Sequence, residues 1–179
     1  MKNGKTKLKN TEMRLISELM KNSRRSDRQL AKALNVSQPT VTRTMAKLEK
    51  EGVIKEFTIV PDFTKLGYSL LAVTFVRLKE SSMSNQTEKA RDAARKSLRE
   101  NRSEVFMLER GIGYNSNGVF LSFHEDYSSY SEFRNWLKQF EFLETSVVES
   151  FLVNLHDDIR YRPLTFTTLA KHILTAKGI

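Results

Sequence analysis

Hydrophobic and polar positions alternate with helical spacing in three short segments of the first third of the chain. The first segment runs from Thr11 to about Lys21 and has an apolar face of Met13, Ile16, Leu19 and Met20. The second and third segments have shorter apolar faces, made of Leu30, Ala31 and Leu34 and of Val41, Met45 and Leu48. Three faces of this kind predict a small three-helix core.

Residues with strong preferences for helix ends separate these segments. Ser26 begins a capping box, and Ser37 is a second N-cap with Pro39 in the first turn behind it. Asn35 tolerates the left-handed conformation of a tight turn, and Gly52 ends the third helix. Two capped helices joined by a tight turn predict a helix-turn-helix, and the alternation over residues 53–60 predicts a wing strand after it.

The outer face of the third helix is rich in hydrogen-bond donors. It presents Gln38, Thr40, Thr42, Arg43 and Lys47. Arg pairs with guanine and Gln with adenine in the major groove of DNA, so this face is typical of a recognition helix. The alternative is an ordinary helical hairpin with a solvated polar face.

The positive charge of the chain is concentrated in this same region. Residues 1–65 carry fifteen Lys and Arg against seven Asp and Glu, whereas residues 66–179 carry fifteen against fourteen. Concentrated cations favour phosphate binding. The backbone contacts that we expect, in addition to the helix N-terminus at Ser37, are Arg24, Arg25, Ser26, Arg28 and, more weakly, Lys55.

The remainder of the chain predicts a second domain of a different class. We expect a basic arm at 1–9, the winged helix-turn-helix at 10–60, a linker at 61–68 and a ferredoxin-like βαββαβ domain at 69–158, which makes the fold class α+β. Its strands are predicted at 69–78, 104–113, 118–125 and 146–155, and its helices at 85–100 and 130–140. Residues 159–179 form an extension in which Leu164, Leu169, Ile173 and Leu174 indicate an amphipathic helix that packs on its own domain or on a partner.

The sequence resembles the Lrp/AsnC (feast/famine) family of transcription regulators over roughly residues 9–158. The resemblance is carried by Ser37, Thr40, Val41, Arg43, Leu48, Glu49, Gly52, Val53 and Ile54, followed by Phe57, Thr58 and the Leu66–Gly67 pair. It implies a DNA-binding regulator whose second domain forms dimers or higher oligomers and binds small effectors, commonly amino acids.

The predicted effector loop departs from the family pattern. The family uses a Gly-x-x-Asp loop between the second and third strands, whose carboxylate meets the ammonium group of the effector. Residues 111–118 (GIGYNSNG) form a longer loop without a carboxylate. Gly111, Gly113, Asn115 and Asn117 are therefore the effector-site candidates, and a hairpin without a ligand is the preferred interpretation.

Other classes of function have less support in the sequence. The chain has no cysteine, no apolar run long enough to span a bilayer and no secretory signal, so we expect a cytoplasmic, nucleoid-associated protein. The triplets His124-Glu125-Asp126 and His156-Asp157-Asp158 follow two predicted strands, but solvated loops are favoured over a metal site. We predict a sequence-specific DNA-binding regulator without cofactor or metal, whose partners are double-stranded DNA and one or more further copies of itself, with binding of a small-molecule effector of unknown identity left open. An architectural DNA-coating protein and a porphyrin enzyme of the siroheme decarboxylase type are the alternatives.

Overall fold

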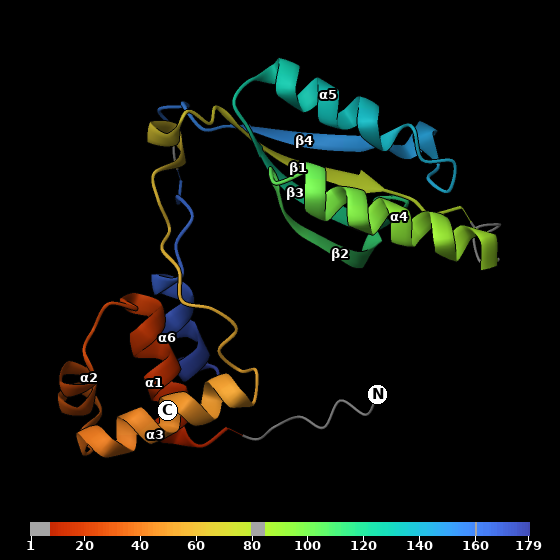
Figure 1. Cartoon of the computed structure of the whole chain (residues 1–179). Helices are drawn as coiled ribbons and strands as arrows, with labels where there is room; N and C mark the ends of the chain where they lie inside the picture. The colour runs from red at the N-terminus through yellow and green to blue at the C-terminus, as the bar shows by residue number, and fades with distance from the viewer. Residues whose placement is uncertain (1–7, 80–84, 160) are drawn as a thin grey trace. The chain divides into compact units, whose positions relative to one another are not determined.

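The chain forms two compact units, and the first of them contains both ends of the described chain. The computed structural model describes residues 8–79, 85–159 and 161–179. The first unit extends to Pro61 and also includes residues 161–179, and the second spans residues 62–160 (Figure 1). Among the described residues, no helix is both long enough and apolar enough to cross a membrane.

Three helices and a fourth from the C-terminal segment build the first unit. They are α1 (Asn10–Lys21), α2 (Asp27–Leu34), α3 (Gln38–Lys50) and α6 (Thr167–Thr175). The predicted three-helix core is confirmed, and its buried side chains are Leu15, Leu19, Leu30, Ala31, Leu34, Val41 and Leu48. The expected face of α1 is wrong in detail, because Leu15 is fully buried whereas Met13 is only half-buried.

Helix α6 packs on α1, so the C-terminal extension completes the helix-turn-helix unit. Ala170 is fully buried, and its carbonyl oxygen accepts a hydrogen bond of 2.8 Å from the hydroxyl of the equally buried Ser17. The predicted helix is confirmed, but its expected apolar face is wrong in part, since Leu164 and Leu169 are exposed. It packs on α1 of the first unit and not on the domain that precedes it in the chain. The reason is that the buried partner of α6 lies about 150 residues away along the chain.

The second unit has the predicted ferredoxin-like order of strands and helices. After the short helix η1 (Phe63–Leu66) come β1 (Leu70–Val76), α4 (Asn85–Asn101), β2 (Val105–Gly113), β3 (Ser116–His124), α5 (Tyr127–Leu137), η3 (Thr145–Val147) and β4 (Glu149–Asn154). The strands form one antiparallel sheet in the order β2-β3-β1-β4. The α+β fold class is thereby confirmed.

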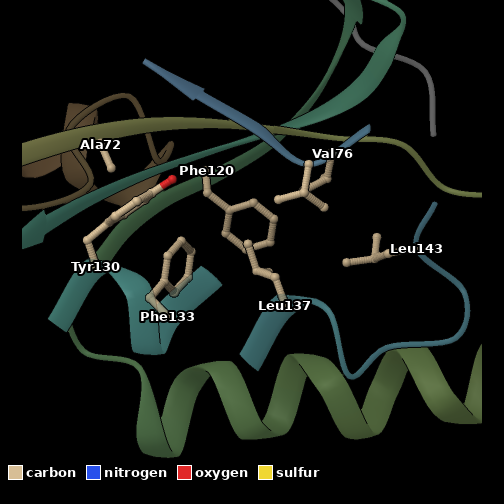
Figure 2. Close-up of a cluster of buried hydrophobic side chains, with 8 residues drawn as sticks. Ala72, Val76, Phe120, Tyr130, Phe133, Leu137 and Leu143 are labelled. Atoms are coloured by element: carbon tan, nitrogen blue, oxygen red, sulfur yellow. The ribbon is translucent and has the colours of Figure 1, made fainter. Parts of the chain in front are cut away.

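The core of this unit lies between the sheet and the aromatic side chains of α5. Figure 2 shows Phe133 and Leu137 of α5 pointing toward Phe120 and Val76 of the sheet. Leu98 of α4 packs against the same cluster, which places both helices on one face. The aromatic stripe of α5 is therefore core, as its spacing indicates.

The opposite face of the sheet has no α-helix on it among the described residues. The register of β1 pairs Leu71 with Phe123 and Val153, and Val73 with Leu121 and Phe151. Phe151 is 67% exposed, whereas Phe63 and Tyr68 of the preceding segment cover one end of this face, where Phe63 stacks on Phe123 at 3.9 Å. We call this apolar surface the open face.

The packing of α6 on α1 predicts a specific sensitivity at Ala170. Ala170→Leu adds three carbon atoms at a fully buried contact and should lower the free energy of unfolding of the first unit by about 1–3 kcal/mol. Urea unfolding followed by far-UV circular dichroism measures this change. Trp136 lies in the second unit, so its fluorescence transition should stay in place.

Leu169→Ala is the matched control, because Leu169 is 45% exposed on the same helix. Equal losses for the two variants would contradict a buried role for Ala170.

Candidate nucleic-acid interface

The turn between α2 and α3 has the geometry that its sequence predicts. The backbone N–H of Ser26 donates to the side chain of Gln29 at 2.9 Å, and the Gln29 N–H returns a bond of 3.3 Å to the Ser26 hydroxyl. Asn35 adopts the left-handed conformation with φ 55°, and Ser37 caps α3 by accepting from the Thr40 N–H at 3.3 Å. These local bonds fix the start of α3 relative to α2.

The outer face of α3 presents two long side chains that can donate hydrogen bonds outward. Gln38 and Arg43 are exposed, and among the described residues neither side chain has a hydrogen-bond or ion-pair partner. Val41 and Leu48, on the inner face, are almost completely buried and hold the helix on the core. The geometry therefore leaves Gln38 and Arg43 available to base edges.

The hydroxyl groups on this face are already hydrogen bonded. Ser37 and Thr40 share a bond of 2.7 Å, in which either can be the donor. The Thr42 hydroxyl donates to the Asp27 carboxylate at the start of α2. Sequence reasoning missed Asp27 as part of this surface, since an acid in the first turn of a helix is explained by the helix dipole alone.

Lys47 is paired with carboxylates of its own unit, so its expected role as a DNA contact competes with a structural one. Its ammonium lies 2.6 Å from Glu12 Oε1 and 3.7 Å from a Glu51 oxygen. Glu12 is only 5% exposed and also accepts a bond of 2.7 Å from the Lys9 N–H. The hydrogen bond from Lys47 is the main cause that lowers the pKa of the Glu12 carboxyl, and burial opposes it. A buried carboxylate requires a cationic partner, which explains why Lys47 pairs with Glu12.

The three arginines around the start of α2 differ in availability. Arg25 forms an ion pair with Glu18 of α1, so its expected role as a phosphate clamp competes with a structural one. The pKa of Glu18 is lowered first by its hydrogen bond with Lys21. Arg24 and Arg28 are exposed, and among the described residues neither guanidinium has an ion-pair partner. These two are the stronger candidates for phosphate contact.

The predicted wing strand is not formed. Residues 53–54 form a bend and residues 55–60 have no regular secondary structure, with no ladder to another described segment, although the Thr58 carbonyl accepts a bond of 3.3 Å from Ser23. Lys55 is exposed there, beside an open groove of about 700 Å³. Alternating residues predict a strand only where a neighbouring strand supplies the ladder.

The expected effector loop is instead a tight hairpin. Strand β2 ends at Gly113 and β3 begins at Ser116, so only Tyr114 and Asn115 form the turn, with φ 49° and 55°. This backbone is typical of a two-residue hairpin, which corrects the expectation of a long loop. Asn117 lies in β3, where its side chain accepts a bond of 2.9 Å from the Leu78 N–H. Gly111 and Gly113 lie on the exposed β2 edge.

The two His-acid-acid triplets do not meet at a metal site. His124 is buried beside Tyr130 and Phe133, with its ring 2.8 Å from the Ser122 hydroxyl, and burial lowers its pKa. Its expected place in a solvated loop is therefore wrong, whereas His156 is exposed. Among the described residues, no group of three or more His, Asp and Glu side chains is arranged to bind a metal ion.

Comparisons with known proteins agree with this geometry. The family model for winged helix-turn-helix DNA-binding domains matches residues 8–55. PH0061 of Pyrococcus horikoshii, an uncharacterized HTH-type transcriptional regulator, is 41% identical over 76 residues, which cover 42% of this chain and 51% of that protein. The regulator LrpC of Bacillus subtilis is 35% identical over 75 residues, covering 42% and 52%. In sequence, the chain spans about half the length of these relatives.

Solved structures extend the similarity to both units. The crystal structure of PH0061 has a TM-score of 0.67 and 25% identity over 88% of this chain and 99% of that one. The structure of LrpC of Bacillus subtilis has a TM-score of 0.63 and 21% identity, and the match covers 87% of this chain and 99% of LrpC. NMB0573 of Neisseria meningitidis, solved as an L-Met complex, has a TM-score of 0.67 and 18% identity, and the match covers 90% of this chain and 99% of NMB0573. This chain thus contains a segment, residues 8–55, that matches the winged helix-turn-helix family. The chain has the two-domain fold of the Lrp/AsnC regulators.

The ion pair between Lys47 and Glu12 predicts a pH-dependent contribution to stability. Because the pKa of Glu12 is lowered in the folded protein, its stabilising effect is complete above the unfolded value near 4.5 and is lost as pH falls through the folded pKa. Lys47→Met should therefore lower the thermal midpoint at pH 7, and its difference from the wild type should shrink at pH 3.

Lys50→Met on the same helix is the control, since Lys50 is exposed and has no ion-pair partner among the described residues. A deficit of the same size for Lys47→Met at both pH values would contradict the role assigned to Glu12.

Proposed function

We propose that this protein is a sequence-specific DNA-binding transcription regulator that acts as a homodimer or higher oligomer on the chromosome. The observation that carries the proposal is the pair of unpartnered side chains, Gln38 and Arg43, on a capped α3 within a strongly basic unit. Arg can read guanine and Gln can read adenine by paired hydrogen bonds in the major groove. The relatives named as transcriptional regulators support the same interpretation.

Arg24 and Arg28 would set the register on the DNA backbone. They lie at the start of α2, the helix that crosses the phosphates when a recognition helix enters the major groove. They carry no sequence information, so they act on all DNA alike. This division separates a sequence-specific regulator from an architectural protein that coats DNA.

The open face of the sheet is the proposed surface for self-association. It presents Val73 and Leu121 beside the exposed ring of Phe151, and apolar surface of this kind is normally covered. Packing two copies of the sheet about a two-fold axis would cover it and hold two helix-turn-helix units at a fixed spacing. One unit alone contacts too few base pairs to find a site among a genome of competitors.

Effector binding is a separate part of the proposal. The hairpin at Tyr114 and Asn115 offers amide and backbone groups and no carboxylate. We therefore expect any effector at this hairpin to lack an ammonium group, since no carboxylate in the hairpin would compensate its charge. The L-Met ligand of the Neisseria protein thus gives no direct guide to the ligand of this chain.

Substitution at Arg43 tests sequence-specific reading. Arg43→Ala should weaken binding to the preferred site by about 1–3 kcal/mol and binding to random DNA only slightly, because a paired base contact is lost. Arg28→Ala should weaken both alike and reduce the slope of log affinity against log salt by about one. Fluorescence anisotropy titrations on both DNAs measure this, and equal losses for Arg43→Ala would favour the architectural function.

Substitution on the open face tests self-association. Light scattering on the wild type should give a dimer or a larger assembly, and Phe151→Glu should reduce its mass, because a charge would face the apolar surface of the second copy. Tyr161→Glu, at a residue 97% exposed in the first unit, should keep the wild-type mass. A monomeric wild type would refute the proposed assembly.

A further inference from the structure

The hydroxyl hydrogen of Thr42 is committed inside the protein. The Thr42 oxygen lies 2.5 Å from Asp27 Oδ2 and 3.2 Å from the carbonyl oxygen of Gln38. A hydroxyl group has a single hydrogen, whereas a carboxylate and a carbonyl can only accept. Thr42 must therefore be the donor in these contacts, and the part of its oxygen that remains for a ligand is a lone pair.

The other hydroxyl groups of α3 are not held by a side chain of another helix. Thr44 donates to the Thr40 carbonyl at 2.7 Å and is only half-exposed. Ser37 and Thr40 bond to each other, and either can be the donor, so one hydrogen of that pair is still free to turn outward. Thr42 is thus the exposed hydroxyl on α3 whose direction is set by another helix.

Asp27 can hold this role because the first turn of α2 fixes its place. It follows the N-cap Ser26 directly, and the two bonds of the capping box hold that turn. A carboxylate near phosphates lowers affinity for any DNA through like-charge repulsion. Asp27 therefore lowers the affinity of this basic surface for DNA. Stability of α2 alone does not require an acid here, because the Ser26–Gln29 capping box already holds the first turn.

We infer that Asp27 makes Thr42 an obligate hydrogen-bond acceptor, so that Thr42 selects a base with an exocyclic amine, cytosine or adenine, at the position it faces. In the major groove these amines are the donors, whereas guanine N7 and O6 and thymine O4 only accept. The inference rests on the proposed function and adds a specificity-determining residue, Thr42, and a positioning residue, Asp27. Gln38 and Arg43 supply the donors on the same face.

The test begins with the full-length protein and a random DNA library, and continues with titration of sites that differ at one base pair. Thr42→Val keeps the shape and removes the acceptor, so at one position the preference for cytosine or adenine should fall about two- to tenfold. Asp27→Ala should relax the same position by a smaller factor, because the Gln38 carbonyl, 3.2 Å away, is then the remaining acceptor for the Thr42 hydrogen and holds it less firmly than the carboxylate does.

The double variant Asp27→Ala with Thr42→Val separates positioning from direct contact. If Asp27 acts through Thr42, Asp27→Ala should not change base discrimination further in the Thr42→Val background. It should still raise affinity for all sequences alike, because a negative charge has been removed. Glu49→Ala, which removes an exposed carboxylate from α3, is the control for that uniform effect.

Each outcome decides between defined alternatives. A preference that survives Thr42→Val would overturn the inference and leave the proposed function intact, since a methyl contact or another residue would then read that base. An effect of Asp27→Ala on discrimination that persists in the double variant would show that Asp27 contacts the base itself. No change in discrimination with Asp27→Ala would overturn its positioning role. No preferred sequence for the wild type would remove the proposed function together with the inference.

Discussion

A buried carboxylate holds the recognition helix on its scaffold. Glu12 of α1 is almost completely buried and is compensated by the ammonium of Lys47 on α3 and by the backbone N–H of Lys9. A charge in this environment is tolerated only while both partners stay in place, so the bond fixes the second half of α3 relative to α1. The cap at Ser37 fixes the start of α3, and the cap at Ser26 fixes the start of α2, on which α3 packs. The position of Gln38 and Arg43 at the surface depends on both constraints together.

Features determined by neighbours in the chain could be predicted from the sequence. Asn35 in the left-handed turn, Ser37 as a cap and the inward face of Val41 and Leu48 all follow from local preferences and spacing. The order of the sheet could also be inferred, because the βαββαβ pattern allows few arrangements. The resemblance to Lrp/AsnC regulators rests on the same local motifs and is supported by the structural neighbours.

Features that depend on distant partners could not be predicted. Lys47 and Arg25 look like free cations in the sequence, but Glu12 and Glu18 of another helix bind them. Residues 53–60 alternate like a strand, yet no described segment lies beside them to complete a ladder. The commitment of the Thr42 hydroxyl to Asp27 spans fifteen residues, and no local pattern reports it. Availability of a polar group is thus a property of the fold.

The return of α6 to α1 affects the order in which the protein can mature. Helix α6 follows the whole second unit in the chain, so a ribosome releases it only after the sheet has been synthesised. Until then the Ser17 face of α1 has no cover, although α2 and α3 are already available to fold. The sheet precedes α6 in the chain, and domains generally fold as units from the N-terminal side onward, so the packing of α6 on α1 is a late step. Completion of the first unit therefore depends on prior synthesis of the whole second unit.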